Sequence, residues 1–203
     1  MNSHVAPELI GVWQRESLAI NSREPFEDSR VVWLQTPSRY ADLRVSIDPG
    51  KATSQACAGT QKWQNSVLTF HHDLDLSGSY PEDIGHISWQ GETMIEQGNV
   101  KINNENIHFR ERWRRCSSAK PDYQTLENRE PNGQLLGIAI CVAEHSLIIN
   151  HTRDFGAGYF KFTNSCWQRQ WATGHDVTHL LPLFSNRKPI DARHTPWQLI
   201  ERR

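Results

Sequence analysis

Long apolar runs and paired cysteines are both missing from this sequence. No stretch approaches the roughly 20 apolar residues that a membrane-spanning helix needs, and residues 1–10 lack the pattern of a secretory signal. The four cysteines, at positions 57, 116, 141 and 166, lie far apart and form no C-x-x-C pair. This spacing favours reduced thiols over a disulfide framework or a zinc site. We therefore expect a cytoplasmic protein that is not inserted in a membrane.

Net charge and the common catalytic motifs are lacking as well. Lys and Arg total 22 against 23 Asp and Glu, so the net charge of -1 provides no global field to attract nucleic acid or an anionic membrane. There is no Gly-x-Ser-x-Gly motif, and Asp154–Gly158 lacks the lysine and the spacing of a phosphate-binding loop. His175 and His179 have the spacing of helical zinc ligands, but no third ligand is evident. We expect no cofactor, no metal and no nucleic-acid partner.

What the chain does have is eight tryptophans and a repeated alternation of apolar and polar residues, which is typical of strands. Turn signals such as Gln90-Gly91-Glu92 and Pro131-Asn132-Gly133 favour hairpins. We predict an all-β fold, an antiparallel meander closed as a barrel, with few short helices. Strands are predicted near residues 9–20, 29–36, 39–47, 66–74, 84–90, 93–98, 105–116, 134–143, 146–153, 158–164, 166–172 and 195–202.

The length of 203 residues suits one large all-β domain, so we predict a single barrel domain over residues 1–203. A polar segment at 117–121 marks the place where a boundary between two lobes would fall. The second half then either extends the barrel or forms a smaller lobe. Asp122 to Glu130 and Asp176 to Leu181 are candidates for short helices.

The strand near 39–47 carries an unusual polar face. Residues two apart share a face of a strand, so Tyr40, Asp42 and Arg44 project to one side. The residues between them, Ala41 and Leu43, project to the other. The triplet is either a solvated surface pair of little energetic value or part of a polar site.

The strand near 105–116 favours the second reading. Ile107, Phe109 and Trp113 share a face, which marks that face as inward, and Glu111 and Arg115 lie on it too. Charged groups inside a fold must be paired or hydrated by a cavity. The opposite face, with its row of arginines, looks solvated; because Trp113 points away from that row, the basic run does not resemble a nucleic-acid surface.

These faces together predict one polar site inside a barrel, lined by aromatic rings. Gln35 joins it because it shares a face with Trp33 on the preceding strand. His71 and Asp73 share one face of the strand near 66–74, and Phe70, His72 and Leu74 the other, so at most one histidine belongs to the site. The predicted ligand-binding residues are Trp33, Gln35, Tyr40, Asp42, Arg44, Glu111, Trp113 and Arg115.

Several motifs resemble a known group of proteins. Gly11-x-Trp13 at the start of the first strand, with a basic residue of the closing strand packed on the tryptophan, is similar to the kernel of lipocalin-like (calycin) barrels. The blocks Trp33-Leu34-Gln35-Thr36, Tyr40-x-Asp42-x-Arg44 and Glu111-x-Trp113-x-Arg115 resemble an uncharacterised, lipocalin-like bacterial family with distant fungal relatives. The resemblance covers roughly residues 9–116. It implies a barrel fold and no particular chemistry.

We expect this protein to bind a small, partly apolar molecule whose anionic or acceptor group reaches Arg44 or Arg115. The alternative is a cofactor-free lyase, isomerase or hydrolase with Tyr40 as acid and Asp42 or Glu111 as base, although carboxylates beside arginine are weak bases at neutral pH. A third class is an interaction module that uses open edge strands, which leaves the inward polar face unexplained. The sequence is compatible with a homodimer and names neither ligand nor reaction.

Overall fold

A computed structural model describes residues 5–21, 23–48, 50, 54–76, 82–102, 105–187 and 196–203, and almost all regular structure in them is β. The predicted all-β class is therefore confirmed. The elements are η1 Pro7–Leu9, β1 Gly11–Ile20, β2 Ser29–Gln35, β3 Tyr40–Ser46, β4 Ser54–Gln64, β5 Val67–Asp75, β6 Glu82–Gln90, β7 Thr93–Ile102, β8 Glu105–Arg115, β9 Tyr123–Arg129, β10 Leu135–Val142, β11 His145–Asn150, β12 Gly156–Thr163, β13 Cys166–Gly174, η2 Thr178–Arg187 and β14 Trp197–Arg202.

The first eight strands form the predicted antiparallel barrel. Each strand pairs with the next along the chain, and β8 returns to pair with β1, which closes the sheet. The short helix η1 fills one end, because Val5 and Leu9 are buried among the aromatic residues of the barrel interior. The indole Nε1 of Trp13 donates a hydrogen bond to the carbonyl oxygen of Leu9 over 2.9 Å, which fixes η1 in place.

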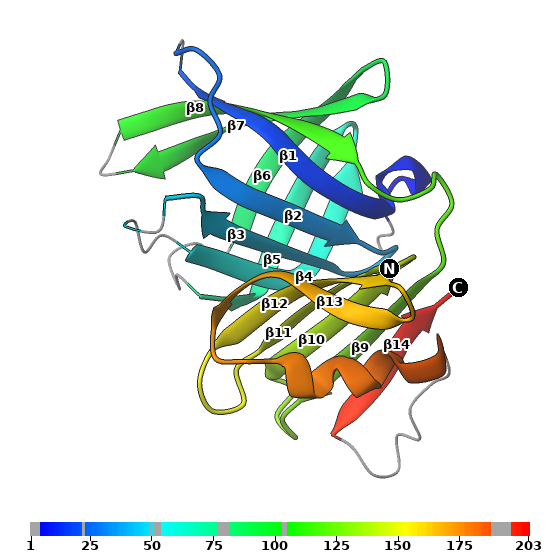
Figure 1. The fold of residues 1–203 in the computed structure, drawn as a ribbon. Coiled ribbons are helices and arrows are strands. Elements are labelled where there is room, and N and C mark those ends of the chain that lie inside the picture. The colour runs from blue at the N-terminus through cyan, green and yellow to red at the C-terminus, as the bar shows by residue number, and fades with distance from the viewer. Residues whose placement is uncertain are drawn as a thin grey trace.

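The C-terminal half does not extend the barrel. It forms a separate six-stranded antiparallel sheet in the order β13-β12-β11-β10-β9-β14, and the segment between β8 and β9 includes the predicted boundary at 117–121. Figure 1 shows this sheet packed beside the barrel, with η2 on the face of the sheet that points away from the barrel. Among the described residues, no helix is long and apolar enough to cross a membrane.

The barrel and the second sheet share an apolar core. Val32 and Leu34 of β2 and Leu43 of β3 are fully buried, although they point out of the barrel, because Ile138 and Leu147 of the sheet cover them. Alanines at positions 41, 56 and 58 of the same layer bring the two sheets close together. Thus β2 to β4 are buried on both faces, the inner one toward the barrel interior.

Two predictions about individual elements are wrong. No strand was predicted over β4, because its outward residues are alanines and its inward ones, such as Cys57 and Gln61, are polar or small, so the usual alternation is weak. The candidate helix at 122–130 is strand β9, whose pairing with β10 and β14 outweighs local propensity. The second candidate helix is present as the 3-10 helix η2, shifted toward the C-terminus.

Bulges change two of the predicted faces. In the β4–β5 pairing, His72 opposes Gly59 and Leu74 opposes Ala58, so Asp73 is the extra residue. Leu74 consequently joins the outer core, whereas His72 faces the interior. A second irregularity after Arg15 in β1 lets both Arg15 and Leu18 face the interior.

Gly59 is required by the close approach of two backbones at the first of these bulges. A Cβ atom at this position would lie 2.0 Å from the carbonyl oxygen of His71 and 2.8 Å from the amide nitrogen of Asp73. Since backbone atoms cannot move aside without breaking strand pairing, Gly59→Ala should lower the free energy of unfolding by about 1–3 kcal/mol. Urea denaturation would measure the change, with the exposed-site variant Ser88→Ala as control; an unchanged midpoint for Gly59→Ala would contradict this close contact.

Candidate functional site

The barrel encloses a cavity of about 510 Å³. Its inner wall is aromatic, made by Trp33, Tyr40, Phe70 and Trp113, whose rings contact one another edge to face. Trp33 and Tyr40 project inward because they alternate with Val32, Leu34 and Ala41, which belong to the core that the barrel shares with the second sheet. Trp113 projects inward because it alternates with Arg112 and the exposed Arg114 on the outer face of β8. At the end away from η1 the lining combines the polar side chains of Asp83, Asn99 and Lys101 with apolar ones, those of Leu18, Ile20, Ile84, Val100, Ile107 and Phe109.

A network of buried ions crosses the cavity wall from β3 to β1. Asp42 accepts a hydrogen bond from Arg44 Nε over 2.8 Å. Glu111 Oε1 lies 2.5 Å from Arg15 Nη1 and 3.5 Å from Arg44 Nη1, so two guanidinium groups hold this carboxylate. Burial opposes the charge on Arg44, but Asp42 and Glu111 overcome that cost and raise its pKa well above its ordinary value. Arg44 therefore stays protonated.

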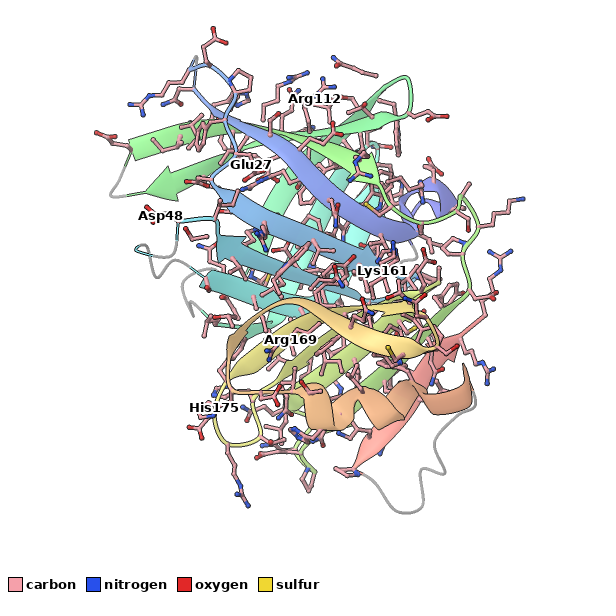
Figure 2. All side chains as sticks on the ribbon, in the orientation of Figure 1. Glu27, Asp48, Arg112, Lys161, Arg169 and His175 are labelled. Carbon is pink, nitrogen blue, oxygen red and sulfur yellow. The ribbon has the colours of Figure 1, made fainter. Side chains whose placement is uncertain are left out.

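Arg15 connects this network to the surface. Its Nε and Nη2 atoms each donate a hydrogen bond of 2.9 Å to Glu27, which lies just before β2 and beside the barrel wall in Figure 2. The Arg15 side chain is only 3 % exposed. All three guanidinium nitrogens of Arg15 thus donate hydrogen bonds inside the wall, and Arg15 holds Glu111 at the cavity.

Glu96 of β7 is the least compensated of the buried acids. It lines the cavity, is 4 % exposed, and has no hydrogen bond or ion pair with the described residues. It lies opposite Glu111 in the β7–β8 pairing. Burial in the first place, and the neighbouring carboxylates of Glu111 and Asp83 in the second, raise its pKa well above the ordinary value of a glutamate. Burial and the neighbouring carboxylates therefore favour the neutral form of Glu96, which faces an open space.

Tyr40 and Cys57 of the inner wall are uncharged. Burial raises the pKa of Tyr40 well above its ordinary value, with Cys57 and Asp42 adding to the effect, and burial likewise raises the pKa of the Cys57 thiol. Neither is a nucleophile at neutral pH. Tyr40 Oη and Trp113 Nε1 are buried and make no hydrogen bond of normal geometry with the described residues.

The structure brings six of the eight predicted ligand-binding residues together along the cavity. These are Trp33, Tyr40, Asp42, Arg44, Glu111 and Trp113. The three candidates for catalytic roles are among them.

The remaining two predicted residues do not line the cavity. Gln35 accepts a hydrogen bond from Trp33 Nε1 over 3.1 Å and donates to the carbonyl oxygens of Thr36 and Arg39, which fixes the turn between β2 and β3. Arg115 lies over the ring of Trp13, 4.2 Å from its centroid, and donates to carbonyl oxygens next to η1. Both act at the closed end of the barrel.

Sequence reasoning missed Arg15, Glu96 and Phe70 as residues of the site. Of the two adjacent histidines, only His72 lines the cavity, with Nδ1 3.3 Å from Asp75 Oδ2. A signal for Arg15 was available, since Trp13-x-Arg15 repeats the Trp113-x-Arg115 pattern of the closing strand. Glu96 could have been found from Met94, which shares its face in β7 and is fully buried.

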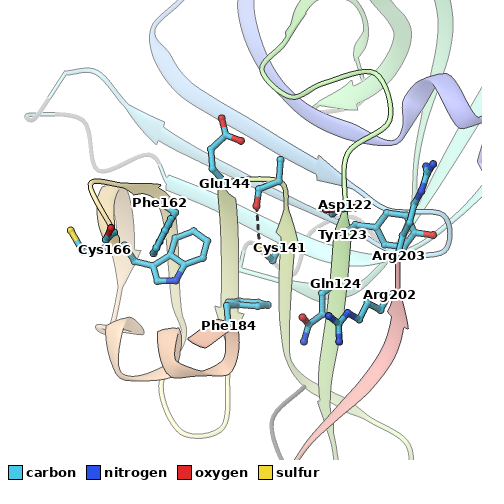
Figure 3. A pocket seen from close by; sticks show the side chains of 13 residues that line it. Asp122, Tyr123, Gln124, Cys141, Glu144, Phe162, Cys166, Phe184, Arg202 and Arg203 are labelled. Atoms are coloured by element: carbon cyan, nitrogen blue, oxygen red, sulfur yellow. Dashed lines mark hydrogen bonds between the residues drawn. The ribbon is translucent and has the colours of Figure 1, made fainter. Parts of the chain in front are cut away.

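A second cavity, of about 430 Å³, lies on the outer side of the second sheet. Figure 3 shows Phe162 on one side, Phe184 of η2 below, and Arg202 with Gln124 on the other side. Cys141 lies between them on β10. Trp167, which contacts Phe162, also lines this cavity. Among the ion pairs given for the described residues, none forms a buried network in this cavity like the one in the barrel, so the barrel cavity is the stronger candidate.

His175 and His179, whose spacing resembles that of helical zinc ligands, belong to no group of metal ligands in the described part of the chain. His175 is exposed and lies 3.6 Å from Asp154, and no group of three or more His, Cys, Asp or Glu in the described part of the chain could hold a metal ion. The described lining of the barrel cavity contains instead the guanidinium group of Arg44 and several carboxyl groups. Such groups can bind a polar head group and can move a proton to or from it.

The chain was compared with known proteins. A family model described as Protein HRI1 matches residues 11–201, which include both the barrel and the second sheet. That description names no activity, substrate or partner. No curated protein and no solved structure matches the chain significantly.

Proposed function

The chain belongs to the HRI1 family, and we propose that it binds a small, partly apolar organic molecule inside its barrel. The observation that carries this proposal is the combination of a cavity of about 510 Å³ with buried charged groups on its wall. Burying ions is costly, and a solid apolar core would be more stable than one that contains Asp42, Arg44 and Glu111. A head group that these residues recognise explains their presence.

The aromatic wall supplies the affinity for the apolar part of the molecule. Trp33, Phe70 and Trp113 already contact one another, so they are held rigid before a ligand arrives. Rigid rings lose little conformational freedom on binding, which favours affinity. The volume suits a molecule of metabolite size.

The polar part of the molecule meets Arg44, whose side chain is 31 % exposed. An acceptor such as a hydroxyl or carbonyl oxygen fits this position. An anionic group would have to displace Asp42 or Glu111 from the guanidinium, because both already neutralise it. We therefore favour an acceptor over the anion that the sequence also allowed, and we assign no ligand contact to Arg115.

We also propose that the barrel is related to lipocalin-like proteins. The packing of Arg115 over Trp13 supports this, since it matches the expected contact between the closing strand and the first tryptophan. Cytoplasmic location, and the absence of nucleic-acid and membrane partners, remain predictions from composition. The cofactor-free enzyme is the second candidate, and the neutral acid Glu96 beside Glu111 is the feature that favours it.

Binding of the neutral fluorescent probe N-phenyl-1-naphthylamine tests the proposed function. We expect the probe to gain emission and to quench tryptophan emission, because Trp33 and Trp113 line the cavity. Val100→Trp places a large ring at the half-buried open end and should weaken binding by roughly tenfold or more. Native mass spectrometry of the purified protein would show whether a cellular molecule dissociates intact.

The matched control is Phe162→Ala, which alters the second cavity and should leave probe binding unchanged. If the probe does not bind, or if Phe162→Ala abolishes binding while Val100→Trp does not, the barrel cavity is not the binding site. Circular dichroism of each variant confirms that it is folded.

A further inference from the structure

The charged groups that line the barrel cavity are predominantly acidic. Five carboxyl groups of the described residues face it, those of Asp42, Asp75, Asp83, Glu96 and Glu111, against the two cations Arg44 and Lys101. With Glu96 and His72 left out of the count, four carboxylates oppose two cations among these described residues, which leaves an excess of two negative charges. Arg15 and Glu27, behind the wall, cancel each other. The potential of the cavity therefore attracts a cation.

Glu96 is the buried carboxyl group of the cavity that lacks a cationic partner among the described residues. Asp42 and Glu111 each have a guanidinium partner, but Glu96 is 4 % exposed and has no cation or hydrogen-bond donor in contact among the described residues. Its carboxyl group packs over Gly85, where a Cβ atom would lie 2.3 Å from Glu96 Oε1. Because no side chain occupies that position, the carboxyl group has room to face the cavity.

The aromatic wall suits the same kind of group. The faces of Trp, Tyr and Phe rings attract cations, most strongly when water is excluded, and boxes of such rings recognise ammonium groups. Trp33, Tyr40, Phe70 and Trp113 are four such rings, and they line the same cavity as Glu96. Carboxylates and rings together are the usual surroundings of a bound amine.

We propose that the molecule bound in the barrel carries a protonated amine, which pairs with the carboxylate of Glu96 against the aromatic wall. This inference rests on the proposed function and names its ligand class. An amine is preferred to a metal ion because no group of three or more potential ligands exists in the described part of the chain.

Binding of such an amine must release a proton. In the free protein Glu96 faces Glu111 from β8, Asp83 from β6 and Asp42 from β3, and Arg44 is the cation that opposes them. An ammonium group at Glu96 favours the carboxylate, so the neutral acid gives its proton to the solvent and the ion pair replaces it. At neutral pH we expect about one proton released for each amine bound.

Three probes with the same apolar body test this proposal: 3-phenylpropylamine, 3-phenylpropan-1-ol and 3-phenylpropionate. Each is titrated into the full chain by calorimetry, in two buffers of different ionisation enthalpy, at pH 7. The amine should bind roughly tenfold more tightly than the alcohol, with the carboxylate weakest, and only the amine should release a proton. In Glu96→Gln the preference for the amine over the alcohol and the proton release should both be lost.

Asp73→Asn is the control, because Asp73 is a half-exposed acid of β5 that lies outside the cavity and near Arg129. This variant should keep the preference for the amine. An alcohol that binds as tightly as the amine, or an amine preference that survives in Glu96→Gln, overturns the inference while the proposed function stands. Failure of all three probes to bind at millimolar concentration overturns both.

Discussion

Replacement of Arg15 by leucine should lower the free energy of unfolding by about 3–5 kcal/mol, the cost of breaking a buried ion pair from one side. Arg15 is 3 % exposed, and it holds Glu111 over 2.5 Å and Glu27 through two hydrogen bonds. Without it, Glu111 keeps only the more distant guanidinium of Arg44. Urea denaturation at pH 7 measures the loss.

The double variant Arg15→Leu/Glu111→Leu distinguishes the loss of the ion pair from the loss of packing by the Arg15 side chain. If the loss comes from an unpaired buried carboxylate, removal of Glu111 as well should recover a large part of it, and the coupling free energy of the double-mutant cycle should exceed about 1 kcal/mol. Additive losses would mean that Arg15 acts through packing alone. Arg114→Leu, an exposed arginine of β8, is the control and should change stability little.

Glu127→Gln should lower the free energy of unfolding by about 2–3 kcal/mol, the range for charge-assisted hydrogen bonds of a buried group. Glu127 of β9 is 2 % exposed and accepts hydrogen bonds from Arg129 over 2.7 Å and from Arg39, which belongs to the turn between β2 and β3. This carboxylate therefore ties the second sheet to the barrel. The neutral amide cannot hold two cations.

The contribution of the Glu127 carboxylate to the free energy of unfolding should depend on pH. Burial alone would raise the pKa of Glu127, but the hydrogen bonds from Arg129 and Arg39 outweigh it, so the pKa lies below its ordinary value. A depressed pKa in the folded state gives stability that is present above about pH 4.3, the unfolded value, and is lost as the pH falls through the folded value. The difference between wild type and Glu127→Gln, measured by urea denaturation, should thus shrink from pH 7 toward pH 3. A constant difference would contradict the ion pairs.

Regular strands could be predicted from the sequence, and so could the residues that regular strands bring together. On β2, β3 and β8 the alternation is unbroken over the relevant positions, so Trp33, Asp42 and Glu111 were placed on one side of the sheet before their pairing was known. Tryptophans on the same faces marked that side as inward. The alternation of side chains between the two faces of a strand is enough to predict the charged inner wall.

The rest depended on pairings that no local pattern reveals. The bulge at Asp73 moves Leu74 to the outer core, and the irregularity after Arg15 lets Leu18 line the cavity. In β9 the polar residues Gln124, Thr125, Glu127 and Asn128 are buried. A run of polar residues in the sequence favours a helix or a loop, and only the partners of these side chains show that the segment is a buried strand. Glu96 was not predicted as a site residue, because the carboxylates that raise its pKa lie on other strands.

Since η1 fills one end of the barrel, the proposed ligand has to enter and leave at the other end, past Leu18, Val100 and Ile107 and the polar side chains of Asn99 and Lys101. Under the proposed function, the width of this opening limits the rates of association and dissociation, whatever interactions lie deeper in the cavity. A compound wider than the opening is excluded before its head group meets any carboxylate. The proposed site therefore selects a compound first by its width and then by its chemistry.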